Sequence, residues 1–229
     1  MAAVDLRGLH PRFSATVMLH AARKGHPVAG VTEAARQLAR VRDPLGLSSL
    51  IEEEDATARL SGPGDGSRFE VERDGRVLQV CPIDVIPTLT ASFWPDLLLD
   101  ADARAGWWVA EHDLVEALLS LAAHPVPEGR LVLSGRRRWQ ATELMHEAAL
   151  LHRRWEQGQV GAFSVEVLAE PQRPPVRVEP VELDDQEPDL GPLHRLLSEH
   201  RSEGWRPQMT VREALMHHLA LVEGALNRG

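Results

Sequence analysis

Apolar residues follow a helical period over residues 12–42. They recur on one helical face: Phe13, Val17 and Ala21. A second helix is expected to begin after Thr32, a favourable N-cap residue, and the Asp-Pro pair at 43–44 is expected to end it. We therefore predict a helical N-terminal segment over residues 1–60.

Residues 68–80 show the pattern of a β-hairpin. Two runs of alternating apolar and polar residues flank Asp74-Gly75, a pair that readily adopts the two positive φ angles of a type I′ turn. A two-residue loop here places four apolar side chains in two cross-strand pairs: Val71 with Leu78, and Phe69 with Val80. All four then lie on one face, which gives the sheet a buried side.

Helical and strand patterns alternate through the middle of the chain. We expect a helix over 93–123, a strand over 130–134, a helix over 135–155 and a strand over 161–169. Strand, helix and strand beside a hairpin are typical of an α+β fold. We predict a small, mostly antiparallel sheet with packed helices, and we assign this α+β core to residues 68–169.

The last part of the chain changes in composition. Residues 170–189 are rich in proline and acidic residues, which predicts an extended acidic connector. Residues 190–229 predict two helices that form a C-terminal helical arm. The second helix is expected to begin with a capping box, in which the Thr210 side chain accepts from the backbone of Glu213 and the Glu213 carboxylate accepts from the backbone of Thr210.

Composition indicates the type of organism and the cellular compartment. The 229 residues include 24 Arg but one Lys, one Asn and no Tyr, a choice typical of a GC-rich bacterial genome. No apolar run is long enough to cross a bilayer, and the N-terminus lacks the pattern of a secretory signal. One cysteine cannot form an internal disulfide. We therefore expect a soluble, cytoplasmic bacterial protein with no membrane partner.

Charge is distributed unevenly around a net value of −9. Residues 61–129 carry 4 basic and 12 acidic groups, residues 130–160 carry 6 and 3, and residues 161–189 carry 2 and 8. The basic middle segment is a candidate nucleic-acid-binding helix, with arginines at both ends: Arg136, Arg137, Arg138, Arg153 and Arg154. The competing interpretation is that these arginines pair with acidic groups of the same chain, because the whole molecule repels polyanions.

Candidate chemistry is sparse. Glu143 and His146 have the Glu-x-x-His spacing of a metal-binding helix, but a second such motif is missing and Leu150 stands where a zinc peptidase needs its second His. Cys81 follows a strand and is more typical of a small core residue than of a nucleophile. We therefore expect no metal or cofactor, and we assign no catalytic residue.

A local resemblance concerns the last helix. The stretch REALMHHLALVEGAL at 212–226 resembles the helix near the end of bacterial kleisins, the segregation-and-condensation subunits that bind the head of SMC proteins. The resemblance implies a distant kleisin-like subunit of chromosome organisation. The amphipathic N-terminal segment of that family is not found at the start of this chain.

These observations favour a non-enzymatic bacterial subunit or adaptor that acts by protein–protein interaction within a larger complex. The short C-terminal arm carries apolar residues that need a cover: Leu193, Leu197, Trp205, Leu215 and Leu219. We expect another protein, or a second copy of the chain, to provide it. The alternative is a nucleic-acid-binding or processing component, kleisin-like or not, that uses the helix from Arg136 to Arg154.

Overall fold

The computed structural model describes residues 3–43, 56–62, 67–86, 105–159 and 186–226. The strands are β1 (Val4–Gly8), β2 (Val28–Ala29), β3 (Ala58–Ser61), β4 (Phe69–Arg73), β5 (Arg76–Pro82), β6 (Val85–Ile86), β7 (Val109–Ala110) and β8 (Gly129–Leu133). The helices are α1 (Pro11–Lys24), α2 (Glu33–Arg42), α4 (Glu111–Ala123), α5 (Ala141–Gln159), α7 (Gly191–Ser198) and α8 (Val211–Leu226). Within these ranges, no helix is both long and apolar enough to span a bilayer.

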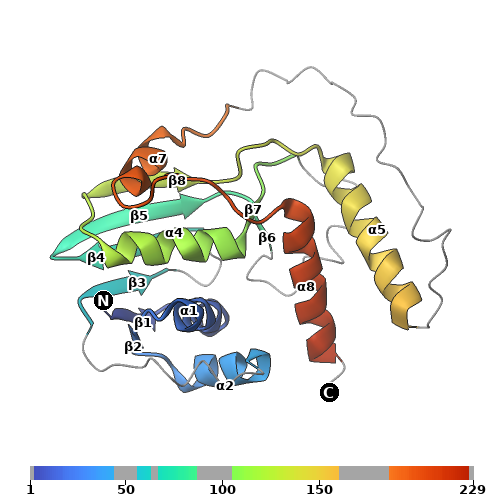
Figure 1. The fold of residues 1–229 in the computed structure, drawn as a ribbon, viewed down its shortest axis with the longest axis horizontal. Helices are drawn as coiled ribbons and strands as arrows, with labels where there is room; N and C mark the ends of the chain where they lie inside the picture. Colours follow the sequence, from blue (N-terminus) through green and yellow to red (C-terminus); the bar gives the residue numbers. More distant parts are fainter. Residues whose placement is uncertain (1–2, 44–55, 63–66, 87–104, 160–185, 227–229) are drawn as a thin grey trace.

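A six-stranded mixed sheet forms the centre of the molecule, with the strand order β2-β1-β3-β4-β5-β8 (Figure 1). Strand β1 pairs in parallel with β2 and β3, and β5 pairs in parallel with β8. The pairs β3–β4 and β4–β5 are antiparallel. The predicted α+β class is confirmed, although the sheet is mixed rather than mostly antiparallel. A second, two-stranded parallel sheet joins β6 and β7.

The β4–β5 hairpin has the predicted register. Its strands place Val71 opposite Leu78 and Phe69 opposite Val80, and all four side chains are buried. Asp74 and Gly75 have φ angles of 51° and 75°, as a type I′ turn requires. The local sequence therefore determines both the turn and the face that the hairpin buries.

The two faces of the large sheet differ in polarity. One face is apolar and buried: Val4, Leu6, Ala58, Leu60, Phe69, Val71, Leu78 and Val80. Helices α1, α4 and α7 belong to the same hydrophobic core as these residues. The alternate residues are polar and at least partly exposed on the opposite face: Arg7, Arg59, Glu70, Glu72 and Gln79. Each large apolar side chain that becomes fully buried stabilises the fold by about 1.5–3 kcal/mol.

The N-terminal segment contains the two predicted helices. Helix α1 begins with Pro11 and ends at Gly25, whose φ of 69° forms a left-handed C-cap. The Thr32 hydroxyl accepts a hydrogen bond from the backbone N–H of Ala35, as expected for the N-cap of α2. The segment also contains strands, which were not predicted. Strands β1, β2 and most of β3 lie within residues 1–60 and belong to the sheet. Strand β1 is as long as β4 and β8, but it has no flanking turn motif such as Asp74-Gly75 to indicate a strand.

The helix predicted over 93–123 is shorter in the structure. Helix α4 begins at Glu111, residues 105–110 are extended, and residues 93–104 lie outside the described ranges. Tertiary hydrogen bonds explain the extended part. Gly106 and Trp139 exchange two backbone hydrogen bonds, of 3.0 and 2.8 Å. The Trp107 amide donates to the Asp84 carboxylate at 2.9 Å. These distant partners hold the segment before α4 in an extended conformation.

The predicted strand at 130–134 is present as β8. The helix predicted from residue 135 begins at Ala141 instead, so α5 follows an irregular segment. The strand predicted over 161–169 lies outside the described residues. The same is true of the connector except for its last residues, 186–189, which have no regular secondary structure.

A second, smaller core lies beside the large sheet. Helices α5 and α8 pack together and lie to one side of the sheet (Figure 1). Their facing residues form this core together with Ile86 of β6 and Ala110 of β7: Leu144, Ala148, Leu151, Val211, Ala214, Leu215 and Leu219. We refer to these residues as the α5–α8 core.

The two predicted C-terminal helices are present as α7 and α8. The capping box of α8 is also present, because the Thr210 amide donates to the Glu213 carboxylate at 2.7 Å and the Thr210 hydroxyl accepts from the Glu213 amide at 3.2 Å. Helix α7 packs against β8 and α4. The C-terminal region therefore contributes to both hydrophobic cores.

Candidate functional site

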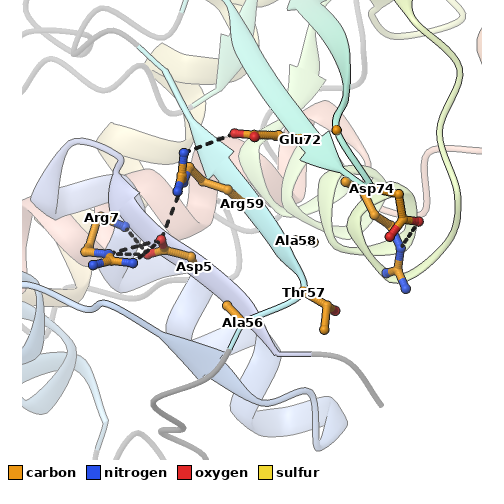
Figure 2. Close-up of a pocket in the computed structure, with 10 residues that line it drawn as sticks. Asp5, Arg7, Ala56, Thr57, Ala58, Arg59, Glu72 and Asp74 are labelled. Atoms are coloured by element: carbon orange, nitrogen blue, oxygen red, sulfur yellow. Dashed lines mark hydrogen bonds and ion pairs between the residues drawn. The ribbon is translucent and has the colours of Figure 1, made fainter.

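A pocket of about 270 Å³ opens on the polar face of the sheet. It is lined by residues of β1, the start of β3 and the β4–β5 turn: Asp5, Arg7, Ala56, Thr57, Ala58, Arg59, Glu72, Arg73, Asp74 and Gly75. Figure 2 shows Asp5, Arg59 and Glu72 in a row across neighbouring strands, with Asp74 further along the pocket. The alternation of the strands places these charged side chains on the face opposite helices α1, α4 and α7.

Asp5 is the buried anion of this pocket. Its side chain is 4% exposed, and its carboxylate accepts hydrogen bonds from the Arg7 amide and from the Arg7 guanidinium at 2.8–3.0 Å. Burial alone would raise the pKa of Asp5, but the hydrogen bonds and positive charge of Arg7, with a further bond from Arg59, lower it below its usual value. Gly30 leaves room for the pair, because a side chain there would collide with Asp5 and Arg7.

Arg59 links two carboxylates. Its guanidinium lies 3.5 Å from Asp5 and 3.1 Å from Glu72, as the dashed lines in Figure 2 show. The charges of the pocket are therefore largely neutralised by one another. Such a surface can bind a small polar ligand through hydrogen bonds, but its carboxylates are held in ion pairs rather than poised for proton transfer. No motif in the sequence indicates this pocket, because its residues come from strands far apart in the chain.

The arginines at the start of the basic segment lie in the loop between β8 and α5, and not on the helix as predicted. Arg137 stacks over the Trp139 ring at 4.4 Å and donates to the Glu143 carboxylate at 2.7 Å. Arg136 is exposed and Arg138 is partly buried. Arg137 therefore binds an acidic and an aromatic side chain of the same chain.

Arg153 and Arg154 lie near the other end of α5, where Arg153 is exposed and Arg154 is partly buried. The helix rises by about 1.5 Å per residue, so roughly 18 Å separate its first residue from Arg153. The two arginine groups are thus placed at opposite ends of α5. The structure does not bring them together into one compact cationic patch.

Glu143 has a structural position at the start of α5. Its carboxylate accepts from the Gln140 amide at 3.1 Å and from Arg137, which satisfies a backbone donor of the first turn. Among the described residues, the groups of three or more candidate metal ligands include neither Glu143 nor His146. The Glu-x-x-His spacing therefore corresponds here to a helix start.

The five apolar residues predicted to meet a partner are covered by other residues of the same chain. Leu193, Leu197 and Trp205 belong to the hydrophobic core between the large sheet and its helices. The Trp205 indole donates to the Ser134 carbonyl at 3.1 Å. Leu215 and Leu219 belong to the α5–α8 core. A partner is not required to cover these side chains, and partner binding elsewhere on the arm stays a prediction.

Asp113 of α4 joins the C-terminal region to the rest of the molecule. Its buried carboxylate accepts from the backbone amides of Gln208 and Met209 at 2.8 and 3.1 Å. Burial raises the pKa of Asp113 even though these hydrogen bonds act in the opposite direction. The segment that leads into α8 is therefore attached to α4 by a buried acceptor.

Two further ionisable groups are buried near the start of α1 and α4. Desolvation raises the pKa of Glu111 to about 7, although the charges of Arg42 and Arg12 oppose the shift. Burial, and to a smaller extent the charge of Arg12, lowers the pKa of His218 to about 4. His218 is therefore neutral at pH 7, on the buried side of α8.

Tryptophans surround the α5–α8 core. Trp108, Trp139 and Trp155 are partly buried and pack against it, as does Met209. Met216 is 50% exposed on α8 and Arg153 is exposed on α5. Arginine lies beside two of these rings, because Arg137 stacks over Trp139 and Arg153 precedes Trp155 by two residues on α5. We refer to Trp108, Trp139, Trp155 and Met209 as the aromatic rim.

No family model, curated protein or solved structure matches this chain.

Proposed function

We propose that this protein is a non-enzymatic bacterial subunit that binds another protein through the outer surface of the α5–α8 helix pair. The observation that carries the proposal is the aromatic rim. Three of the six tryptophans of the chain pack, partly buried, against this small core. Tryptophan and arginine are the residues most often found at the energetic centre of protein interfaces.

The helix pair has a form suited to docking. Helix α5 packs mainly against α8 and lies beside the sheet rather than on it. Thr142, Ala149, Arg153 and Glu156 recur along α5 as exposed residues, and we place the partner on this side of the helix. Met216 supplies an apolar contact, whereas other exposed large apolar residues among those described lie elsewhere, on α2 (Leu38 and Val41) and on β5 (Val77).

Charge indicates the chemistry of the partner. Residues 130–160 carry a net charge of +3 within a chain of −9. A partner surface with apolar side chains surrounded by carboxylates complements the aromatic rim and the exposed Arg136 and Arg153. Such complementarity mainly sets the association rate and partner choice. The bacterial setting rests on the codon-biased composition and the cytoplasmic setting on the single cysteine, and both belong to the same proposal.

Nucleic acid is the second candidate for the same surface. Arginine beside tryptophan also binds single strands, because the aromatic ring stacks on a base while the guanidinium contacts phosphate. The separation of the arginines along α5 and the pairing of Arg137 with Glu143 favour a protein partner. A salt titration distinguishes the two, since counterion release makes nucleic-acid affinity fall steeply with salt.

The proposal is tested by the native mass of the tagged chain purified gently from its host. We expect an assembly heavier than the 25.4 kDa monomer that is lost in Met216→Asp and retained in Val77→Asp, a matched change at an exposed apolar residue of the sheet. Light scattering of the recombinant chain alone separates a second copy from a different partner. Equal assembly by both variants, or a monomer throughout, would overturn the proposal.

A further inference from the structure

His20, His112 and Glu116 form a cluster outside the surfaces described so far. Their ligand atoms all lie within 4.8 Å of one another. His20 Nδ1 is 3.5 Å from Glu116 Oε1, and the rings of His20 and His112 are 4.4 Å apart in an edge-on arrangement. The side chains of His20 and Glu116 are 10% and 11% exposed. His20 and Glu116 are therefore largely buried and His112 is partly buried, with two imidazoles and one carboxylate close together.

Two packed helices create this arrangement. His112 and Glu116 are four residues apart on α4, so their side chains share one face of the helix. His20 lies on α1, which packs against α4 over the large sheet. A four-residue spacing on one helix with a third ligand from a neighbouring helix is a common way to fix three ligands rigidly.

We propose that His20, His112 and Glu116 bind a divalent transition-metal ion, with Zn²⁺ as the preferred ion. Two imidazole nitrogens and one carboxylate oxygen are a ligand set well suited to zinc. Bonds of about 2.1 Å in tetrahedral geometry place ligand atoms roughly 3.4 Å apart. The 3.5 Å between His20 Nδ1 and Glu116 Oε1 already matches this spacing. Side-chain rotation of His112 then completes the set.

Lys24 contributes to the same site from the last turn of α1. It is the one lysine of the sequence, and its ammonium group pairs with Glu116 Oε2, whereas His20 faces Oε1. The two oxygens of Glu116 thus have separate partners. Lys24 orients the carboxylate and leaves Oε1 for the metal, as outer-shell partners of ligating carboxylates do.

The metal has two expected consequences. It links α1 to α4 and so stabilises the helical layer, because ligand binding to the native state alone raises its stability. Three protein ligands also leave a fourth coordination position for water or a small anion, the form found in zinc sites with an exchangeable ligand. This site uses none of the residues of the proposed docking surface and does not depend on it.

The test uses the full-length chain after removal of metal with a chelator. We expect titration calorimetry with ZnCl₂ to show one strong site per chain, and zinc to raise the midpoint of thermal unfolding. We expect Co²⁺ to give the intense visible absorption of a tetrahedral site. Both His112→Gln and Glu116→Gln should weaken zinc binding by roughly tenfold or more, at least the loss seen for outer-shell partners.

A matched control is present on α5. His152 and Glu156 form another His/Glu pair with the same four-residue spacing, 3.7 Å apart. The double change His152→Gln, Glu156→Gln should retain the strong site. Lys24→Met, which keeps all three ligands, should retain one Co²⁺ site even if the fold is weakened. Absence of a one-to-one zinc complex in the unmodified chain would overturn the proposal. So would equal binding by His112→Gln and the control.

Discussion

At the residue scale, the charge state of each buried ionisable group depends on the groups that the fold places around it. Asp5 is stabilised as an anion by Arg7 and Arg59, and Glu111 lies near Arg12 and Arg42. His218 differs, because its environment favours the uncharged imidazole. Asp5 and His218 therefore both make the fold less stable in acid, Asp5 by losing its charge and His218 by gaining one.

We predict that the low pKa of His218 makes the free energy of unfolding decrease as the pH falls. Its pKa in the native state, about 4, lies below the ordinary value of 6.5, so the unfolded chain binds more protons between these values. Its contribution to the free energy of unfolding is then present above pH 6.5 and decreases on acidification by up to about 1.4 kcal/mol per pH unit. The measurement is urea unfolding from pH 7.5 to pH 4.5 for the unmodified chain and His218→Leu.

Between pH 7.5 and pH 4.5, we expect the free energy of unfolding to decrease more for the unmodified chain than for His218→Leu. His217→Leu alters the exposed neighbour on the same helix and is the matched control. A pH-independent difference for His218→Leu would show that this histidine is not desolvated in the native state.

At the element scale, the β4–β5 hairpin is the clearest case of local determination. We predict that Gly75→Val destabilises the protein by about 1–2 kcal/mol, because a β-branched residue is strained at the φ of 75° found there. Chemical denaturation measures the change. Arg76→Val, one residue further along and in the strand, is the control and should cost much less. Equal stabilities for Gly75→Val and the unmodified chain would contradict the turn.

The elements that were predicted correctly contain local sequence motifs for a helix cap or a turn. Thr32 caps α2, the Thr210 and Glu213 side chains cap α8, and Asp74-Gly75 forms the turn. The elements that were missed have no such signal. Strands β1, β2 and β7 contain two to five residues, and pairing with distant strands holds them extended. Tertiary hydrogen bonds likewise override the helical pattern before α4.

At the scale of the whole molecule, the C-terminal region is integrated into the fold. We predict that the fragment 1–189 is strongly destabilised, because it lacks Leu193, Leu197 and Trp205, which are at most 2% exposed. Losing three such side chains costs more than about 5 kcal/mol, which is comparable to the total stability of many domains. Circular dichroism and light scattering of the fragment test this expectation.

A longer fragment, 1–210, retains α7 and Trp205 and should melt closer to the full-length chain. A fragment 1–189 that stays monomeric and melts like the full-length protein would contradict the integrated fold. It would support instead a C-terminal arm that is separable from the core.

Functional surfaces proved harder to predict than the fold class. The pocket joins Asp5, Arg59 and Glu72 across three strands, and the histidine cluster joins α1 to α4 across about ninety residues. The four-residue spacing of His112 and Glu116 is visible in the sequence, but nothing local indicates that His20 faces them. The arginine clusters were visible too, but the contacts of Arg137 with Glu143 and Trp139 were not. Such sites depend on packing between distant elements.

The proposed docking surface is tested most directly by photo-crosslinking in the host cell. A photoreactive phenylalanine analogue replaces Met216 in one version of the chain and Val77 in another, two exposed apolar positions on α8 and on the sheet. We predict a discrete, nuclease-resistant protein adduct from position 216 and none from position 77. An adduct from position 77 alone, a nuclease-sensitive adduct, or none from either position would contradict protein docking on the α5–α8 pair.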